Sequence, residues 1–213
     1  MTDMTQRLSQ QLAFVVEVDK LKSILRQTTI TCAECRREND AEHSWHIALM
    51  ASLLAEYATA KVDVGRVMRM LLLHDIVEID AGDTFAYDVA AYADKEEREV
   101  RAADRIFGLL PTDQGTEFRA LWDEFEAGTT EESRFANALD RIQPLLLNFY
   151  SGGGSWGSHR VTRPQVLTRM DPVRRNTPEL WPVVLSIVDQ ACSRGWIVTE
   201  NAVEPETQSA SGV

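Results

Sequence analysis

The sequence has few cysteines and no long apolar run, and these absences exclude several classes of protein. Its three cysteines are an odd number that offers no disulfide framework, as is typical of a reducing compartment. Apolar stretches such as residues 70–73 and 145–147 are far too short to cross a bilayer. The opening residues, MTDMTQRLSQQ, lack the apolar core and the cleavage site of a secretory signal. We therefore expect a cytoplasmic protein that is not bound to a membrane.

Basic residues are also scarce in the sequence. The 22 lysines and arginines are outnumbered by 33 acidic residues, which gives a formal net charge of −11. Sequence-independent binding of nucleic acid needs a surplus of cations that face the phosphates, so we expect no stable nucleic-acid binding. The charge does not exclude a small phosphorylated substrate, because a bound metal and one or two arginines reverse the local sign.

Helical periodicity is what the sequence has in abundance. Apolar residues make up 44% of the chain, and they recur at helical spacing from Leu8 to about Arg26, where we expect the first helix. After the loop TTITCAECRREND, further helices are predicted over residues 41–60, 64–79, 95–110, 115–128, 130–142, 165–175 and 178–195. No long alternating β-branched run is present. The sequence therefore predicts an all-α fold, with a single helical domain over residues 1–195 and a disordered tail over residues 199–213.

Some polar residues and one proline predict how these helices begin and bend. Asn39 or Asp40 can cap the helix that follows them, and Asp63 can cap the next one. Pro144 lies four residues after Asp140, so its ring opposes the carbonyl of that aspartate. We expect the helix to bend or restart there, with the aspartate directed inward.

The pair His74 and Asp75 is the strongest chemical signal. It follows an apolar segment in MLLLHDIVEIDAGD, so both side chains should lie near the core, where polar groups are costly unless they are paired. A divalent metal would supply that pairing. Glu78 lies three and four residues further along and should share their helix face. One helix is therefore predicted to present two metal ligands and a nearby carboxylate.

Two further ligands would come from other helices. His43 lies in AEHSWHIALM, one turn before His46, and Asp140 lies in FANALDRIQPLLLN. Two imidazoles and two carboxylates suit one divalent metal, which is Mn²⁺, Co²⁺, Fe²⁺, Zn²⁺ or Mg²⁺. Four protein ligands on an octahedral ion leave two positions for water and a phosphate oxygen.

With these motifs in place, the sequence resembles the HD-domain phosphohydrolases, especially the branch of the bacterial 5′-deoxynucleotidases and their eukaryotic relatives. The resemblance covers about residues 12–144, through LKSILRQT, RRENDAEHSWHIALM, LLLHDIVEIDAGD and ALDRIQP. It implies an HD-domain helical bundle that hydrolyses phosphomonoesters, foremost (deoxy)nucleoside 5′-monophosphates. It also implies a homodimer, because members of the family are often dimers.

The resemblance also implies roles for single residues. His43, His74, Asp75 and Asp140 match the metal ligands of the family. Glu78 matches an acidic residue that activates or protonates at the reacting phosphate. Asp75 and Glu78 are therefore expected to position the attacking water or to handle its proton.

Substrate contacts follow from the same comparison. Arg26 matches an arginine that reaches the substrate, and Asp83 matches an aspartate that helps to shape the nucleotide site. Arg37 and Lys95 are further candidates for phosphate contacts, beside the alternative that their charges are merely solvated. Gln27 stands where a family member has a tryptophan, so that stacking surface for the base is missing.

Several other interpretations stay open from the sequence alone. The same scaffold could split a cyclic dinucleotide, an alarmone or a nucleoside triphosphate, or it could be a nucleotide-binding module without activity. Asp140 and Arg141 could form a surface ion pair. Cys32 and Cys35 form a lone CxxC that we take as incidental. The glycine-rich segment 151–159 is predicted to be a mobile surface loop with one anchoring aromatic residue.

Overall fold

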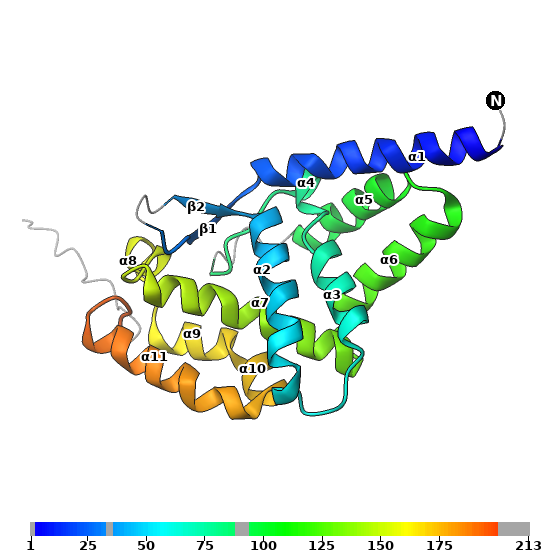
Figure 1. The fold of residues 1–213 in the computed structure, drawn as a ribbon. Coiled ribbons are helices and arrows are strands. Elements are labelled where there is room, and N and C mark those ends of the chain that lie inside the picture. The colour runs from blue at the N-terminus through cyan, green and yellow to red at the C-terminus, as the bar shows by residue number, and fades with distance from the viewer. Residues whose placement is uncertain (1–2, 33–35, 88–93, 200–213) are drawn as a thin grey trace, which may run out of the picture.

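Helices dominate the computed structural model, which describes residues 3–32, 36–87 and 94–199 (Figure 1). In chain order the elements are α1 (Asp3–Val18), η1 (Asp19–Ser23), β1 (Leu25–Thr29), β2 (Arg37–Asn39), α2 (Asp40–Leu54), η2 (Ala55–Tyr57), α3 (Val64–Leu73), α4 (Glu78–Ala81), α5 (Lys95–Phe107), α6 (Thr112–Ala127), α7 (Glu131–Tyr150), α8 (Ser155–Ser158), α9 (Arg163–Arg169), α10 (Asp171–Asn176), η3 (Pro178–Leu180) and α11 (Trp181–Ser193), where η marks a 3₁₀ helix. The predicted all-α fold is confirmed, and the described residues add a small two-stranded sheet. Within the described ranges, no helix combines the length and the apolar character needed to cross a membrane.

The helix α7 lies at the centre of the packing. It contacts α2, α3 and α6, and also α10 and α11 nearer the bottom of Figure 1. Ile47, Leu71 and Leu139, one from each of α2, α3 and α7, are fully buried where these helices meet. Burying such a side chain contributes about 2 kcal/mol to stability. The neighbouring helices α2 and α3 are thereby packed against α7, which lies much later in the sequence.

Side-chain caps explain where these central helices begin. The side chain of Asn39 accepts a hydrogen bond from the backbone N–H of Glu42, and the Glu42 carboxylate accepts one from the backbone N–H of Asn39. Asn39 is therefore the cap of α2, and Asp40 is the first helical residue. Asp63 caps α3 through the backbone N–H of Arg66, as predicted.

The prediction that the first helix runs to about Arg26 is wrong. The helix α1 ends at Val18, and η1 leads into β1, which pairs antiparallel with β2. Both strands are too short for alternation to be visible in the sequence, and the pairing across the intervening loop decides their conformation. Arg26 therefore lies on a strand beside the start of α2.

The predicted single helix through His74, Asp75 and Glu78 is also wrong. The helix α3 ends at Leu73, a tight turn follows, and α4 begins at Glu78. The turn is closed by i→i+3 bonds, among them one of 2.9 Å from the backbone N–H of Glu78 to the carbonyl of Asp75. The indole N–H of Trp122 donates to the carbonyl of His74 over 3.2 Å. The turn, rather than one helix face, arranges the three polar side chains.

The later segments differ from expectation in smaller ways. The helix α7 continues through Pro144 to Tyr150 without restarting. Within residues 151–159, α8 carries Trp156, which is only 1% exposed, so the expected anchoring aromatic residue is part of the core. The helix predicted over residues 165–175 is divided in two, because α9 ends at Arg169 and α10 begins at Asp171. Cys32 is exposed, whereas Cys35 and the expected tail beyond residue 199 lie outside the described residues.

Candidate metal centre

Four predicted ligands from three parts of the fold lie together in the core. His43 comes from α2, His74 and Asp75 from the turn after α3, and Asp140 from α7. Nε2 of His43 lies 3.0 Å from Oδ1 of Asp140, and Nε2 of His74 lies 3.0 Å from Oδ1 of Asp75. Nε2 of His74 is 3.7 Å from Oδ1 of Asp140, and all four side chains are buried. The two imidazole nitrogens therefore face the same pair of carboxylates.

The contacts of His74 indicate that these four side chains fit a divalent cation. Its Nδ1 bonds the carbonyl of Leu71 over 2.9 Å, which directs Nε2 toward the carboxylates. That Nε2 is buried and makes no hydrogen bond of acceptable geometry, which is costly for a polar atom. One atom each from His43, His74 and Asp75 lies within 4.8 Å of the others, so a single ion can reach all three. A cation bound there would compensate the buried nitrogen.

The electrostatics of the cluster also favour a cation. Burial disfavours the protonated form of His74, but the negative charges of Asp75 and Asp140 raise its pKa to about 10. Burial would raise the pKa of Asp140, yet Arg141, His43 and His74 hold it well below its usual range. Both carboxylates therefore carry charge in the core, and metal binding would exchange protons for the ion.

A second cluster, made of acidic side chains, shares Asp75 with the predicted metal ligands. Atoms of Asp40, Asp75 and Glu78 lie within 4.8 Å of one another, and all three side chains are buried. Nη1 of Arg26 lies 2.6 Å from Oδ2 of Asp75 and 3.2 Å from Oδ1 of Asp40. Burial, with the charges of Asp75 and Asp40, raises the pKa of Glu78 well above its usual range. Burial and Asp75 raise the pKa of Asp40 to about 7.

Asp140 and Arg141 do form an ion pair, but not one on the surface. Nη1 of Arg141 contacts Oδ2 of Asp140, and the aspartate is only 5% exposed. The other oxygen of Asp140 faces His43. The ion pair therefore fixes the orientation of the carboxylate in the cluster.

Sequence reasoning missed Glu38, Asp40 and Gln143. Glu38 and Asp40 flank the start of α2, where acidic residues are expected as caps, so their burial was not apparent. Gln143 has no charge to mark it, although it follows Asp140 by three residues on the buried side of α7. The only available signal was their position within the motifs around His43 and Asp140.

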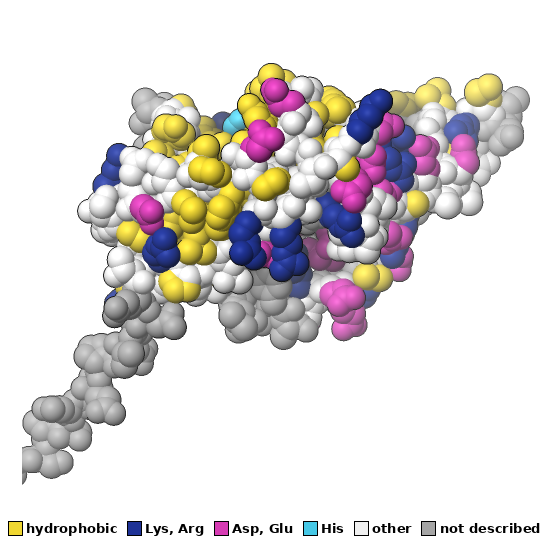
Figure 2. All heavy atoms as spheres, turned by 90° about the horizontal axis from the view of Figure 1, so that it is seen from below, with side chains coloured by type: hydrophobic (Ala, Val, Ile, Leu, Met, Phe, Trp, Pro, Cys, Tyr) yellow, Lys and Arg dark blue, Asp and Glu magenta, His cyan; other side chains and the backbone are white. Residues whose placement is uncertain are grey.

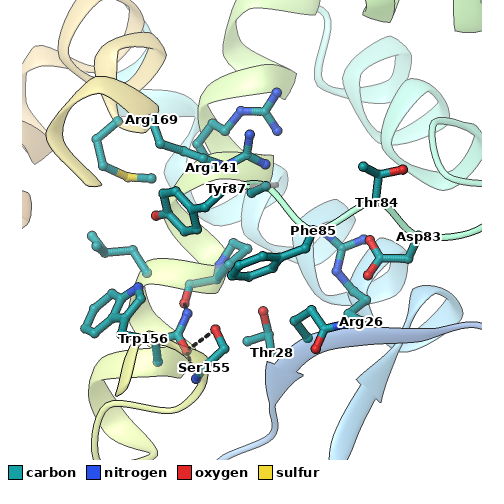
Figure 3. A pocket seen from close by; sticks show the side chains of 16 residues that line it. Arg26, Thr28, Asp83, Thr84, Phe85, Tyr87, Arg141, Ser155, Trp156 and Arg169 are labelled. Carbon is teal, nitrogen blue, oxygen red and sulfur yellow. Dashed lines mark hydrogen bonds between the residues drawn. The ribbon is translucent and has the colours of Figure 1, made fainter. Parts of the chain in front are cut away.

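A pocket opens beside the cluster, and Arg26 belongs to both (Figure 3). Asp83, Phe85 and Tyr87 line it from the segment after α4, and Trp156 lines it from α8. The Phe85 and Tyr87 rings lie edge to face, with centroids 5.4 Å apart. Position 27 has a glutamine in place of a tryptophan, but Phe85 and Tyr87 supply aromatic surface elsewhere in the pocket.

The pocket is also rich in arginine. Among its described lining residues, Arg26, Arg141 and Arg169 carry positive charge and Asp83 carries the one carboxylate. Arg169 and Arg141 both lower the pKa of Tyr87, although burial raises it overall, so both cations lie close to that phenol. In a chain of net charge −11, this is a local reversal of sign suited to an anionic ligand.

The remaining predicted substrate residues lie in different places. Nε of Arg37 donates to the carbonyl of Arg26 over 2.5 Å, and its charge acts on Asp83. Lys95 lies at the start of α5, with Nζ 3.1 Å from Oε1 of Glu99. It lines a separate pocket with Trp122 and Glu126. Contact of these side chains with a substrate stays a prediction.

The chain is similar to several known proteins. The HD domain family model matches residues 18–181. A solved structure of a predicted metal-dependent phosphohydrolase from Magnetospirillum magnetotacticum is 56% identical with a TM-score of 0.87, and the match covers 92% of this chain and 98% of that one. The 5′-deoxynucleotidases HDDC2 of Xenopus laevis and Homo sapiens are 31% and 30% identical over 63% of this chain.

The chain spans just under two thirds of those two curated relatives, at 66% and 65% of their lengths. The family match lies inside the range of 1–195 predicted for the domain, whose outer limits stay a prediction. It includes every residue proposed as a metal ligand. The chain therefore belongs to the HD domain family.

Proposed function

We propose that this chain is a metal-dependent phosphomonoesterase that acts on (deoxy)nucleoside 5′-monophosphates. The observation that carries the proposal is the buried cluster of His43, His74, Asp75 and Asp140, in which Nε2 of His74 has no hydrogen-bond partner. The names of the relatives support the substrate class, since HDDC2 is a 5′-deoxynucleotidase. The name of the Magnetospirillum protein supports dependence on a metal.

Those four side chains would hold one divalent cation, which supplies a Lewis acid for the phosphoryl group and lowers the pKa of a bound water. Zn²⁺, Mn²⁺, Co²⁺, Fe²⁺ and Mg²⁺ all remain compatible with the donor set. Asp75 belongs both to the set of metal ligands and to the cluster with Asp40 and Glu78, and it would accept a hydrogen bond from the attacking water. Arg26, buried against Asp75 and also lining the pocket, would stabilise charge that develops on the phosphate.

Glu78 is suited to protonate the leaving group. Burial and the charges of Asp75 and Asp40 raise its pKa well above the usual range, which favours the protonated carboxyl group. A carboxylic acid can transfer that proton to the 5′-oxygen as the phosphorus–oxygen bond breaks, so that a neutral nucleoside leaves. The glutamate then recovers a proton from the water that attacked.

The pocket would receive the nucleoside part of the substrate. Phe85 and Tyr87 offer aromatic surface for a base, and Asp83 offers a carboxylate for a sugar hydroxyl. Arg37 supports the backbone of Arg26, and Lys95 would assist only if the substrate reached α5. The arginines of the pocket favour a substrate that carries phosphate.

A substrate panel tests this function. Nucleoside mono- and triphosphates, a cyclic dinucleotide and an alarmone are incubated with the protein and each metal, and phosphate, pyrophosphate and nucleoside are all quantified. We expect phosphate and nucleoside in equal amounts from a 5′-monophosphate. Release of pyrophosphate would favour a triphosphatase or alarmone hydrolase. Tight binding without turnover across the metal series would favour a nucleotide-binding module and reject the enzyme.

We also propose a homodimer in the cytoplasm. Large apolar side chains are exposed on neighbouring helices, namely Trp45, Leu49 and Leu53 on α2 and Leu72 on α3. We call these four residues the α2–α3 apolar face. Figure 2 shows further apolar side chains on the face seen from below, where Figure 1 places α11, which has Val183 exposed. Exposed apolar area of this kind supports self-association.

A further inference from the structure

A buried glutamine connects the proposed metal ligands to a second layer of polar side chains. Gln143 lies on α7 and is fully buried. Its Oε1 lies 3.1 Å from Nδ1 of His43, and its Nε2 lies 2.7 Å from Oε1 of Glu38 and 3.1 Å from Nδ1 of His46. A buried amide is costly unless it is hydrogen-bonded, and here every group of the amide has a partner.

These contacts determine which way the amide points. A carboxylate oxygen accepts hydrogen bonds, so the NH₂ group of Gln143 must face Glu38. The second N–H of the same group is then directed to His46, which must accept it at Nδ1. The amide oxygen is left facing His43. Because that oxygen only accepts, Nδ1 of His43 has to carry the hydrogen.

The hydrogen on Nδ1 defines the metal-binding form of His43. A neutral imidazole carries one hydrogen, so a neutral His43 with its hydrogen on Nδ1 offers the lone pair of Nε2 to a metal. Nε2 is the nitrogen that faces the cluster, 3.0 Å from Oδ1 of Asp140 and 3.9 Å from Oδ2 of Asp75. In the metal-free protein a hydrogen on Nε2 can be shared with Oδ1 of Asp140, and a bound cation would take its place. The opposite tautomer would keep that hydrogen and would block coordination.

We propose that Gln143 is a positioning residue which, oriented by Glu38 and His46, holds His43 in the tautomer whose Nε2 binds the metal. The inference rests on the proposed metal centre and adds three residues to it. The other carboxylate oxygen of Glu38, Oε2, lies 3.6 Å from Nδ1 of His43. Its charge also favours a hydrogen on Nδ1. Groups that orient metal-bound histidines in this way typically change metal affinity by about 10- to 100-fold when they are removed.

Co²⁺ binding to the metal-free full-length protein tests the role without any measurement of turnover. We expect Gln143→Leu to raise the Kd for Co²⁺ by about 10- to 100-fold, because the hydrogen on Nδ1 loses its acceptor. Asn137→Leu is the matched control. Asn137 lies on the same helix and also donates two hydrogen bonds through its amide, to the carbonyls of Phe125 and Ser133, but it is not in the network. This control should bind Co²⁺ like the wild type.

Exchanging the side chains of Glu38 and Gln143 distinguishes a role in orienting His43 from a simple loss of packing. Gln143→Glu alone places two carboxyl groups against each other and should weaken Co²⁺ binding. The double variant Glu38→Gln with Gln143→Glu restores a carboxylate acceptor for His43 and an amide donor beside it, so most of the affinity should return. Should Gln143→Leu prevent folding, this pair of variants still decides the question.

The tautomer can be observed directly. In the Zn²⁺-loaded wild-type protein labelled with ¹⁵N, His43 should retain the hydrogen on Nδ1 and coordinate through Nε2. Coordination through Nδ1, wild-type Co²⁺ affinity in Gln143→Leu, or a double variant no better than Gln143→Glu would each overturn the role. Failure of the wild type to bind Co²⁺ would instead overturn the metal centre itself, and the role with it.

Discussion

The charge around His74 has a measurable consequence at the scale of one residue. Asp75 and Asp140 raise its pKa to about 10, against the opposing effect of burial, so the metal-free protein holds a proton where the proposed cation would bind. The folded-state pKa lies above the ordinary value of 6.5. This proton therefore stabilises the metal-free fold at neutral pH, and that contribution is lost as the pH rises through about 10.

We therefore expect metal binding to release protons. The apparent Kd for Mn²⁺ should fall by about tenfold per pH unit for each proton released between about pH 7 and 9, because fewer protons then compete with the ion. Titration calorimetry in buffers of different ionisation enthalpy counts the protons. A Kd that is constant over this interval contradicts the expected competition at His74.

Removal of Asp75 should separate catalysis from folding. Asp75→Ala is expected to lower kcat/KM for a nucleoside 5′-monophosphate by about 100-fold or more, since a ligand and a water-positioning group are both lost. The circular dichroism spectrum should stay helical. Asp80→Ala is the control, because Asp80 lies on the next helical segment and pairs with Arg105 at the surface. Full activity of Asp75→Ala would reject the proposed centre.

Some residues of the site could be predicted from the sequence, and others could not. His43, His74, Asp75 and Asp140 could be proposed because their residue types and motifs point to a metal. Glu38, Asp40 and Gln143 could not, because acidic side chains at a helix start and a glutamine in a helix have ordinary explanations. Only the packing of α2 against α7 shows that their polar atoms are buried beside the ligands.

For helices and strands, features set by nearby residues could be predicted, whereas features set by distant contacts could not. The caps of α2 and α3 follow from side chains within three residues, and the sequence predicts them. The end of α3 at Leu73 and the pairing of β1 with β2 depend on neighbours elsewhere in the chain, such as Trp122, which binds the carbonyl of His74. Helical periodicity alone continues through His74 and through Arg26, so it predicted helices that are too long.

The helix α9 offers a test of the pocket at the scale of an element. Arg169 lies at its C-terminal end and lines the pocket, whereas Arg163 lies at its N-terminal end and pairs with Asp189 on α11. Arg169→Gln should raise KM for a nucleoside monophosphate by about tenfold, the loss of one charged hydrogen bond. Arg163→Gln should leave KM unchanged. Equal kinetics of the two variants would place the substrate away from α9.

Self-association belongs to the scale of the whole molecule. Light scattering after gel filtration should give twice the single-chain mass of 24.0 kDa. Replacing Leu49 and Leu53 by Glu would put charge into the α2–α3 apolar face, and we expect the single-chain mass from that variant. Leu8→Glu is the control, since Leu8 is similarly exposed, at 53%, but lies on α1. A wild-type protein at 24.0 kDa contradicts the proposed dimer.

Because α2, α7 and the turn after α3 meet at the proposed metal site, a bound ion would also stabilise the fold. A cation coordinated by all three would link segments that lie about thirty and sixty-five positions apart along the chain, much as a crosslink closes large loops. None of the three could then detach alone without breaking coordination bonds. A chelator would accordingly loosen the centre of the molecule as well as stop turnover, and sensitivity to proteolysis would report how tightly the ion had been tying those segments together.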